Sequence, residues 1–472
     1  MPSENKIATF KNHIFMIGFG SIGQGVLPLI MRHIDVKPEQ ISITTADDRG
    51  REEAEKYNIS FEINPLTPEN YRQVLGSHLS KGDFVINVSV DVSSTALISL
   101  CQEKGALYID ASVEPWAGGY IDPSLTVSQR SNYALRESAL ALVQKHKGGP
   151  TAIICHGANP GMVNHFFKQA LFNMAQETGL KFSKPTTREE WGALAERLGI
   201  KAIHIAERDT QVCQKPKEVD EFINTWSIDG FCDEGNQPAE LGWGTHEKTM
   251  PLNGARHTFG CDAAIYINRP GFKTPVRSWT PVEGSYHGFL ITHNESISIA
   301  DYLTLRKDGQ VTYRPTCYYA YHPCDAAVSS VHEVNGKNGK QQSRQRLIRD
   351  EISDGMDELG VLMMGNDKGV YWFGSRLSIH QARELAPYNN ATSLQVTIAV
   401  LASMVWALEN PQRGVIEAEN MDYERIMELA TPYLGDVVGV WGKWNPVQDR
   451  GVLFPEDMDT SDPWQFKNFL VN

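Results

Sequence analysis

The chain has 472 residues, which is enough for two or three domains with cores of their own. Hydrophobic residues make up 41% and charged residues 21%, which excludes a disordered or fibrous protein. The formal net charge is −13 and no stretch is dense in Lys and Arg, so we expect no nucleic-acid partner. The seven cysteines are scattered along the chain, which is typical of a reducing compartment.

Two segments bear on the location of the protein. The N-terminal stretch MPSENKIATFKNH lacks the long apolar core of a secretory signal. The longest apolar stretch, VTIAVLASMVWAL over 396–408, is too short to span a bilayer and predicts a buried helix. We therefore expect a cytoplasmic protein without a membrane partner.

The first third of the chain alternates strand-like and helix-like segments. Apolar runs at HIFMIGF, ISITTAD, DFVINVSV and ALYIDAS, and another run from Thr151, predict strands. Helical patterns lie between them, the first from Ser21 to about Arg32. This βαβ series predicts an α/β fold with a doubly wound parallel sheet of the Rossmann type, which we expect over residues 1–155.

The rest of the chain has a different pattern. Thr187 and Glu190 form a capping-box signature that predicts the start of a helix. Short β-rich runs, among them GFLITHNESISIADYLTL, predict a second, α+β domain over 156–385. Within it, 335–346 is polar and predicts an exposed loop. For 386–472 we expect C-terminal helices that partly pack back on the first domain.

A glycine motif follows the first predicted strand. Gly18, Gly20 and Gly23 have the spacing G-x-G-x-x-G, with Ser21 and Ile22 between the last two. The first glycine permits a tight turn, the second lets a pyrophosphate approach the backbone, and the third brings helix against strand. We expect this motif to bind NAD. A glycine turn that serves only helix packing is the alternative.

An acidic residue is expected at the end of the second strand, where it would bind the ribose hydroxyls. Asp47 is nearest to that position, with Asp48 beside it. Arg49 and Arg51 lie close enough to suit the 2′-phosphate of NADP as well, but we expect NAD.

Polar side chains follow two more of the predicted strands, at the edge where such sheets bind ligands. They are Asn87, Ser89 and Asp91 after one strand, where we also expect Val90 to contact the cofactor, and Asp110 and Glu114 after the next. We expect Asp91 and Glu114 to face the nicotinamide end of the cofactor. The alternative for Asp91 is that it only caps the helix that starts near Ser93.

Three stretches of the second domain combine apolar context with polar groups. They contain His204, Glu207 and Asp209; Trp226, Asp229 and Glu234; and His293, Asn294 and Glu295. Carboxylates around a tryptophan suit an aliphatic diamine, because they fix the ammonium ends while the indole face stabilises a cation in transit. The alternative is a core tryptophan with surface carboxylates.

Metal-bound and nucleophile-based chemistries have little support in the sequence. Cys317, His322 and Cys324, and the pair Cys155 and His156, match no common zinc spacing. There is also no G-x-S-x-G elbow for a serine nucleophile. We therefore expect no metal site.

With these residues identified, the chain resembles the bacterial homospermidine synthases over nearly its whole length. The matching stretches include IGFGSIG, RSNYALRE, GANPGMV, HIAERDTQ, QPAELGWGT, RSWTP, THNESISIAD and DTSDPWQF. The resemblance implies a Rossmann domain joined to a second domain of the saccharopine-dehydrogenase type. It also implies a homodimer that holds NAD tightly through the reaction cycle.

The chemistry implied by the resemblance involves no net oxidation. NAD oxidises putrescine to an imine, a second putrescine attacks it, and ammonia leaves. The new Schiff base then takes the hydride back to give symmetric homospermidine, and spermidine is an alternative aminobutyl donor. The expected partners are therefore putrescine and related polyamines.

Roles follow from the resemblance by matching motifs. Trp226 corresponds to the cation–π tryptophan at the imine, and Glu207 to the carboxylate that meets the substrate amine. The remaining pocket residues are Asn159, His293, Glu295 and Asp91 as catalytic groups, Glu114 and Glu234 as substrate-binding groups, and Asn159 and Pro160 beside the cofactor.

Two other functions share the fold and the glycine motif. A net oxidoreductase of the saccharopine or carboxynorspermidine dehydrogenase type would need arginines for a substrate carboxylate, whereas the residues in these motifs are mostly acidic. A non-catalytic NAD-binding regulator would leave the carboxylates around Trp226 without a use.

Overall fold

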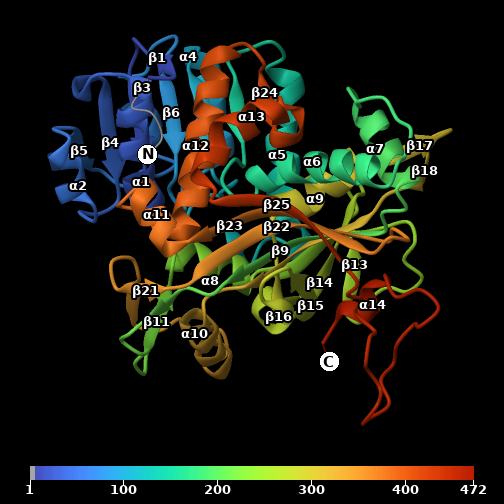
Figure 1. Ribbon diagram of the computed structural model, residues 1–472. Coiled ribbons are helices and arrows are strands. Elements are labelled where there is room, and N and C mark those ends of the chain that lie inside the picture. Colours follow the sequence, from blue (N-terminus) through green and yellow to red (C-terminus); the bar gives the residue numbers. More distant parts are fainter. Residues whose placement is uncertain (1–5, 472) are drawn as a thin grey trace.

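The computed structural model describes residues 6–471, which fold around two sheets that lie one above the other in Figure 1. The first sheet has seven parallel strands in the order β24-β8-β7-β6-β2-β4-β5. Its strands are β2 (Ile14–Ile17), β4 (Ile41–Thr45), β5 (Ser60–Ile63), β6 (Phe84–Asn87), β7 (Leu107–Asp110), β8 (Ala152–Ile154) and β24 (Val415–Glu417). The predicted Rossmann sheet is confirmed.

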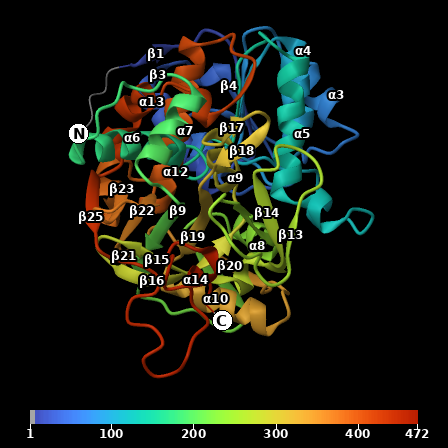
Figure 2. The same cartoon turned by 90° about the vertical axis from the view of Figure 1, so that its right-hand side faces the viewer.

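Helices cover this sheet as the βαβ pattern requires. They are α1 (Ser21–His33), α2 (Arg51–Lys56), α3 (Tyr71–Gly76), α4 (Ser94–Lys104) and α5 (Asn132–Lys145). Figure 2 shows α4 and α5 side by side on one flank. The short strands β1 (Ala8–Thr9) and β3 (Ile34–Asp35) pair with each other. Because α1 begins at the predicted Ser21, the glycine motif leads directly into a helix.

The late segment of the chain returns to this first domain. Helix α12 (Ala391–Glu409) packs along α1, and β24 adds a strand at the edge of the parallel sheet (Figure 1). Among the described residues, α12 is the helix long and apolar enough to cross a membrane, and 89% of its most apolar window is buried inside the fold. Its apolar character is therefore explained by packing on both sides.

The second sheet has ten strands, most of them antiparallel. The order is β13-β14-β12-β19-β9-β22-β23-β25, and β16 joins β15 to β19. Its strands are β9 (Ala202–Asp209), β12 (Pro238–Gly242), β13 (Gly254–Arg256), β14 (Ala264–Pro270), β15 (Pro275–Thr280), β16 (Gly284–Ile291), β19 (Thr316–His322), β22 (Met356–Met364), β23 (Val370–Ser378) and β25 (Asp436–Gly442). Three further pairs of short strands lie outside it: β10 (Val212–Cys213) with β21 (Ile352–Asp354), β11 (Glu221–Asn224) with β20 (Arg344–Leu347), and β17 (Leu305–Lys307) with β18 (Gln310–Tyr313).

Helices of the second half fill the space around this sheet. They are α6 (Met162–Glu177), α7 (Arg188–Arg197), α8 (Ile228–Asn236), α9 (Asn294–Tyr302), α10 (Asp325–Gly336), α11 (Ile379–Leu385), α13 (Tyr423–Ala430) and α14 (Phe466–Phe469). Helix α6 contacts β22 and β23 and covers the sheet face toward the first domain. The predicted capping box is confirmed, because Thr187 and Glu190 cap α7 reciprocally.

Two local predictions are wrong. The run THNESISIAD was expected to be β-rich, but Asn294–Tyr302 forms helix α9, in which residues 294–300 are all buried. Its Ser-Ile alternation imitates a strand because the helix is enclosed on every side and needs no polar face. The expected exposed loop 335–346 is also incomplete, since Gln342 is buried and Arg344 begins strand β20.

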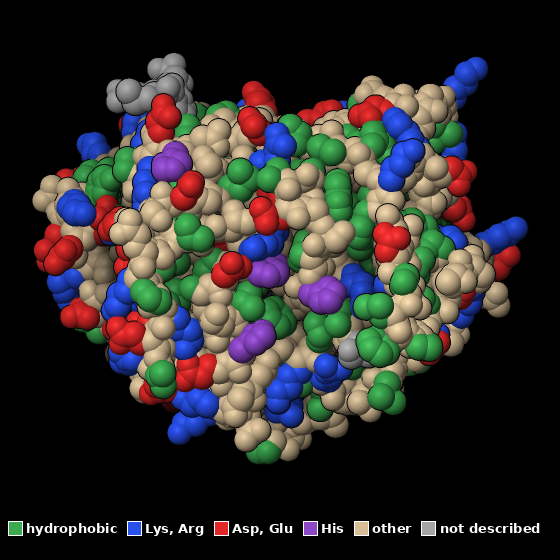
Figure 3. Space-filling view, turned by 60° about the horizontal axis from the view of Figure 1, so that its bottom comes forward, with side chains coloured by type: hydrophobic (Ala, Val, Ile, Leu, Met, Phe, Trp, Pro, Cys, Tyr) green, Lys and Arg blue, Asp and Glu red, His purple; other side chains and the backbone are tan. Residues whose placement is uncertain are grey.

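Charges on the surface are mixed. On the face shown in Figure 3, acidic and basic side chains are interspersed, and several histidines lie near its centre. This distribution is typical of a globular protein surface.

One buried guanidinium joins the two domains. Arg136 of α5 is 1% exposed, and its Nε and Nη2 donate to the Glu417 carboxylate of β24 at 2.6 and 2.8 Å. Nη2 also donates to Asp301 of α9 at 3.0 Å. Since α9 packs on the second sheet, Arg136 ties that sheet to the edge of the parallel sheet.

Replacing Arg136 with Met should lower stability strongly, because it leaves Glu417 buried without its partner. Loss of one member of a buried ion pair costs about 3–5 kcal/mol. We expect the midpoint of thermal unfolding to fall well below that of Arg425→Met, whose ion pairs with Glu409 and Glu428 are partly exposed. Equal midpoints for the two variants would contradict this role of Arg136.

Candidate active site

The glycine loop between β2 and α1 is shaped for a close backbone approach. Gly18 has a φ of +80°, and a Cβ there would lie 2.7 Å from the Ser89 Cα. A Cβ at Gly23 would lie 2.9 Å from the Gly18 carbonyl oxygen, so this glycine brings helix against strand. A Cβ at Gly20, in contrast, would meet no atom within 4 Å. The middle glycine therefore borders the open space where a pyrophosphate would lie.

The first turn of α1 presents free backbone donors to this space. Gly20 is the N-cap, no side chain caps the helix, and its first turn holds no acidic residue. Ser21 and Ile22 form that turn and are partly exposed. A helix N-terminus in this state fits an anionic group such as the phosphates of NAD.

The loop after β6 is ordered by Asn87. Its Oδ1 accepts hydrogen bonds from the Ser89 backbone N–H at 3.3 Å and from the Ser89 hydroxyl at 2.6 Å. Val90 follows, and Asp91 has a left-handed backbone with φ of 62°. Asn87 therefore holds the loop against Gly18, and its own side chain is buried.

Two acidic residues predicted for the cofactor have protein partners. Asp47 follows β4 as expected, and Arg49 Nε donates to its carboxylate at 2.8 Å, which lowers the pKa of Asp47. Asp110 is 1% exposed and accepts from the Cys155 N–H at 2.7 Å and from the Tyr108 hydroxyl at 2.8 Å. Asp110 thus supports the loop after β8, and both its oxygens are occupied within the protein.

Glu207 lies where the loop after β8 meets the second sheet. Its Oε2 accepts from the Tyr319 hydroxyl at 2.6 Å and from the Asn159 amide at 3.1 Å. Burial raises the pKa of Glu207 to about 8, and the neighbouring Asp209 adds to the rise. Pro160, next to Asn159, lines the cavity described below. A carboxyl with this pKa exchanges protons near neutral pH.

Trp226 is fixed by the edge of its indole ring and is partly exposed. The indole Nε1 donates to the Tyr321 hydroxyl at 3.0 Å, and Phe231 packs at a ring distance of 5.5 Å. Tyr321 in turn stacks on Tyr319, at 5.1 Å between ring centres. Tyr321 and Tyr319 of β19 therefore connect the indole of Trp226 to the carboxylate of Glu207.

His293 lies between two carboxylates. Its Nε2 is 3.1 Å from Glu234 and its Nδ1 is 3.2 Å from Glu295. Burial disfavours the charged ring, but Glu295 and Glu234 outweigh burial and raise the pKa of His293 to about 10. His293 is therefore an imidazolium at neutral pH. Its ring lies 4.4 Å from that of Tyr319, which places it beside the Glu207 group.

A narrow cavity of about 30 Å³ lies between the two domains. Its lining includes Glu114, Tyr120, Pro160, Glu234 and His293. Burial raises the pKa of Glu114 to about 8, and the charge of Glu234 adds to the rise. The Tyr120 hydroxyl donates to Glu114 at 3.1 Å. The cavity wall therefore carries acidic groups from both domains.

Further acidic residues lie near this cavity. Burial and the charge of Asp229 raise the pKa of Asp91. Burial raises the pKa of Asp233 to about 6, with Asp91, Asp229 and Glu234 adding to it. The structure thus brings Asp91 of the first domain toward helix α8, rather than leaving it only as a helix cap.

Sequence patterns did not single out several of these groups. They are Tyr120, Asp233, Tyr319 and Tyr321. The stretch TCYYAYH does hold a signal, since Tyr319 and Tyr321 alternate along one face of a strand. Their partners come from segments more than 90 residues away, so the pairing itself was not predictable.

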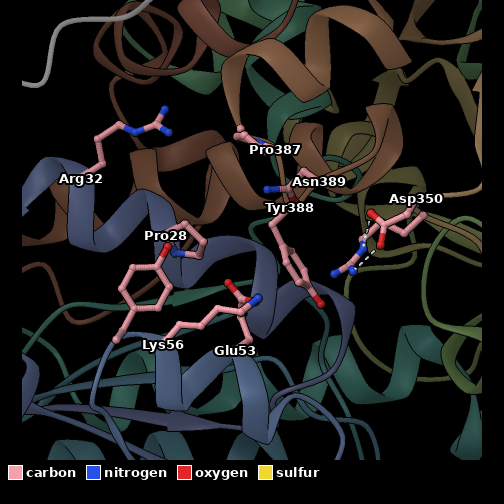
Figure 4. A pocket seen from close by; sticks show the side chains of 11 residues that line it. Pro28, Arg32, Glu53, Lys56, Asp350, Pro387, Tyr388 and Asn389 are labelled. Atoms are coloured by element: carbon pink, nitrogen blue, oxygen red, sulfur yellow. Dashed lines mark hydrogen bonds and ion pairs between the residues drawn. The ribbon is translucent and has the colours of Figure 1, made fainter.

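Another hollow, of about 460 Å³, lies elsewhere, where α1 and α2 face the segment before α12 (Figure 4). Four of its charged side chains form ion pairs, Lys56 with Glu53 at 2.6 Å and Arg349 with Asp350 at 2.7 Å, and Arg32 donates to the Leu385 carbonyl and the Tyr433 hydroxyl. It contains none of the predicted site residues. Among the described residues no group of three or more His, Cys, Asp or Glu is placed to hold a metal ion.

Comparison with known proteins gives consistent matches. The family model of the saccharopine dehydrogenase NADP binding domain matches residues 14–153, and that of the saccharopine dehydrogenase C-terminal domain matches 157–442. A homospermidine synthase of Blastochloris viridis is 56% identical over 463 residues, which are 97% of each chain. That of Mesorhizobium japonicum is 52% identical over 465 residues, 97% of this chain and 96% of the relative.

A solved structure agrees with these relatives. The homospermidine synthase of Legionella pneumophila, crystallised in complex with NAD, superposes with a TM-score of 0.93 at 49% identity and 99% coverage of both chains. Both sequence and fold therefore match from end to end, and the chain belongs to the homospermidine synthase family, built from the two domains of saccharopine dehydrogenase.

Proposed function

We propose that this chain joins two putrescine molecules to symmetric homospermidine and ammonia, with Glu207 as the base at the reacting amine. The observation that carries this proposal is the buried Glu207 carboxylate, held by Asn159 and Tyr319 beside the indole of Trp226. The acidic cavity next to it suits an aliphatic diamine, since carboxylates on its wall pair with ammonium groups.

NAD, when bound at the glycine loop, accepts a hydride from the first amine and returns it to the final imine. Before that transfer, the reacting ammonium must lose a proton, because a protonated amine has no lone pair to assist hydride loss. Glu207 receives this proton. The cationic imine that results lies against the face of Trp226, where the ring stabilises it without bonding to it.

The second diamine is held by the acidic groups of the cavity. Glu114 and Glu234 face its ammonium groups. The two ring N–H groups of His293 each hold one carboxylate, Nε2 that of Glu234 and Nδ1 that of Glu295. The free amine of the second diamine attacks the imine carbon. The C–N bond to the first nitrogen then breaks, and ammonia leaves with the proton returned by Glu207. The atoms of two putrescines equal those of homospermidine plus ammonia, so no oxidant is consumed.

The alternative of a net dehydrogenase is less well supported. A saccharopine-type substrate carries carboxylates, which need arginine partners. The residues lining the 30 Å³ cavity include Glu114, Glu234 and His293 but no arginine or lysine. The pocket therefore favours polyamines, spermidine among them.

Two further properties belong to this proposal. All seven cysteines are free thiols, which supports a cytoplasmic location. The homodimer implied by the family resemblance stays a prediction, and the mass of the NAD-loaded protein in solution would check it.

The balance of products tests the reaction type. With putrescine as the sole substrate and NAD in catalytic amount, we expect homospermidine and ammonia to form in equal amounts while absorbance at the NADH wavelength stays flat. NADH that accumulates in proportion to consumed putrescine would show a net oxidoreductase instead.

Changes at Trp226 test the stabilisation of the cationic imine. A desolvated cation–π contact contributes about 2 kcal/mol, so Trp226→Ala should lower kcat roughly 30-fold while NAD affinity is retained. Trp226→Phe keeps an aromatic face and should lose less. Trp441→Ala, on the distant strand β25, is the matched control and should keep the parent kcat. An unchanged kcat in Trp226→Ala would show that the indole has no such role.

The pH profile tests Glu207. Since its pKa is raised to about 8 and its charged form is the base, kcat/KM should fall about tenfold per pH unit below pH 8. Glu207→Gln should lose roughly 100-fold or more at every pH, because the amide accepts no proton. If kcat/KM of Glu207→Gln equals that of the parent across the pH range, Glu207 is not the base.

A further inference from the structure

A buried pair of carboxylates lies next to Glu207 and has no part in the roles above. Asp209 follows Glu207 by two residues on β9, so both side chains lie on the same sheet face, about 7 Å apart along the strand. Asp357 of β22 is the direct cross-strand neighbour of Asp209. All three side chains are enclosed, with Glu207 2% exposed and both aspartates 0% exposed.

Hydrogen-bond donors converge on Asp209 and not on Asp357. Asp209 accepts from the Gln211 backbone at 2.8 Å, from the Gln211 amide at 3.1 Å and from the Thr225 hydroxyl at 2.8 Å. Asp357 Oδ1 is buried without any hydrogen-bond partner among the described residues. A carboxylate with several donors is stabilised as an anion, and one with an unpartnered oxygen in a dry site is not.

The hydroxyl of Thr392, at the start of α12, joins the two aspartates. Its Oγ1 lies 2.6 Å from Asp357 Oδ2 and 3.3 Å from Asp209 Oδ2. A single hydroxyl can donate to only one of the two carboxyls. Both contacts are hydrogen bonds when Thr392 donates to Asp209 and a protonated Asp357 donates to Thr392. The Gln211 amide donates to the same hydroxyl at 3.0 Å, so in that state Thr392 accepts from Gln211 and Asp357 and donates to Asp209.

No cation neutralises this cluster. The titratable or charged groups that face it are Arg208 on β9, Tyr286 on β16, Tyr319 and Tyr321 on β19, His293 before α9, Cys324 before α10, and Glu358 on β22. Within the described residues none of them forms an ion pair with Asp209 or Asp357; Arg208 pairs with Asp325 and Glu283 instead. Three neighbouring buried carboxyls without a paired cation cannot all be ionised.

We propose that Asp357 holds a proton, that Asp209 carries the negative charge, and that this charge sets the basicity of Glu207 toward the substrate ammonium. The inference rests on the proposed role of Glu207 as the base. Asp209 and Asp357 are both 0% exposed and act through Glu207, so both are positioning residues. An anion about 7 Å away opposes a second negative charge on Glu207 and therefore makes its carboxylate a stronger base.

The shifts in pKa distinguish the two aspartates. Burial raises the pKa of Asp209, but the hydrogen bonds from Gln211 and Thr225 and the charge of Arg208 oppose that rise. Burial is the main cause of the raised pKa of Glu207, and Asp209 adds to it against the hydrogen bonds from Tyr319 and Asn159 and the charge of His293. Burial likewise raises the pKa of Asp357 well above its usual range, with the charges of Glu207 and Asp209 adding to the rise.

The experiment measures kcat/KM for putrescine against pH with the full-length, NAD-loaded enzyme. Asp209→Asn removes the charge, so the rise of activity with pH should move to lower pH by about one unit or more. Asp357→Asn keeps a neutral side chain that donates to Thr392, so the rise should stay at the pH of the parent. Asp354→Asn, an exposed position on β21, is the matched control for loss of an acidic residue.

Several outcomes would overturn the inference. A profile in Asp209→Asn that rises at the pH of the parent refutes it, as does a shift in Asp357→Asn with none in Asp209→Asn. If Asp209→Asn does not fold, Thr225→Val replaces it, because loss of one donor weakens the anion and should move the rise the same way by less. No shift in that variant also refutes the inference.

Failure of the proposed function is distinguishable from failure of this inference. Parent-level activity in Glu207→Gln would show that Glu207 is not the base, which refutes the proposed function. Loss of activity in Glu207→Gln together with an unshifted profile in Asp209→Asn leaves the function intact and removes only the role of Asp209.

Discussion

The burial of carboxylates between two sheets is the constraint on which the rest of this structure depends. A carboxylate taken out of water is costly unless it gains hydrogen bonds or shares its proton. Glu207 meets this requirement with one partner beside each sheet, Asn159 in the loop that follows β8 of the parallel sheet and Tyr319 in the second sheet. The site therefore exists only when the domains are docked, and Arg136 fixes that docking from the opposite end of α9.

The loops at the carboxyl edge of the parallel sheet carry the geometric cost of this arrangement. Gly18, Asp91 and Cys155 all have left-handed backbone conformations, each directly after or near the end of a strand. Such conformations are costly for residues other than glycine and persist where the surroundings enforce them. Here they turn the chain sharply, so that the N-terminus of α1 and the loop that carries Asn159 reach the same edge of the sheet.

The pocket shows how a dehydrogenase fold is adapted to another substrate class. The domain pair matches saccharopine dehydrogenase, yet the cavity wall carries Glu114, Glu234 and an imidazolium flanked by carboxylates. Fold alone leaves the substrate open, and the chemistry of the wall decides it. Acidic walls suit the ammonium groups of polyamines, and under the proposed function the face of Trp226 stabilises the cationic imine.

The sequence by itself determined the features that depend on neighbouring residues. The glycine motif, the βαβ order, the start of α1 at Ser21 and the capping of α7 by Thr187 all follow from local spacing, and the structure confirms them. The same local evidence failed at α9, whose alternating Ser and Ile imitate a strand, because complete burial removes the polar face that marks a helix.

Only the tertiary structure decided which distant residues share the site. Asp110 had the expected position at a strand end, but its oxygens are used by Cys155 and Tyr108. Asp209 and Asp357 become neighbours through the pairing of β9 with β22, almost 150 residues apart in the chain. The protonation of a carboxyl depends on the charges and donors around it in space, so no spacing along the chain could reveal which of these acids keeps its proton.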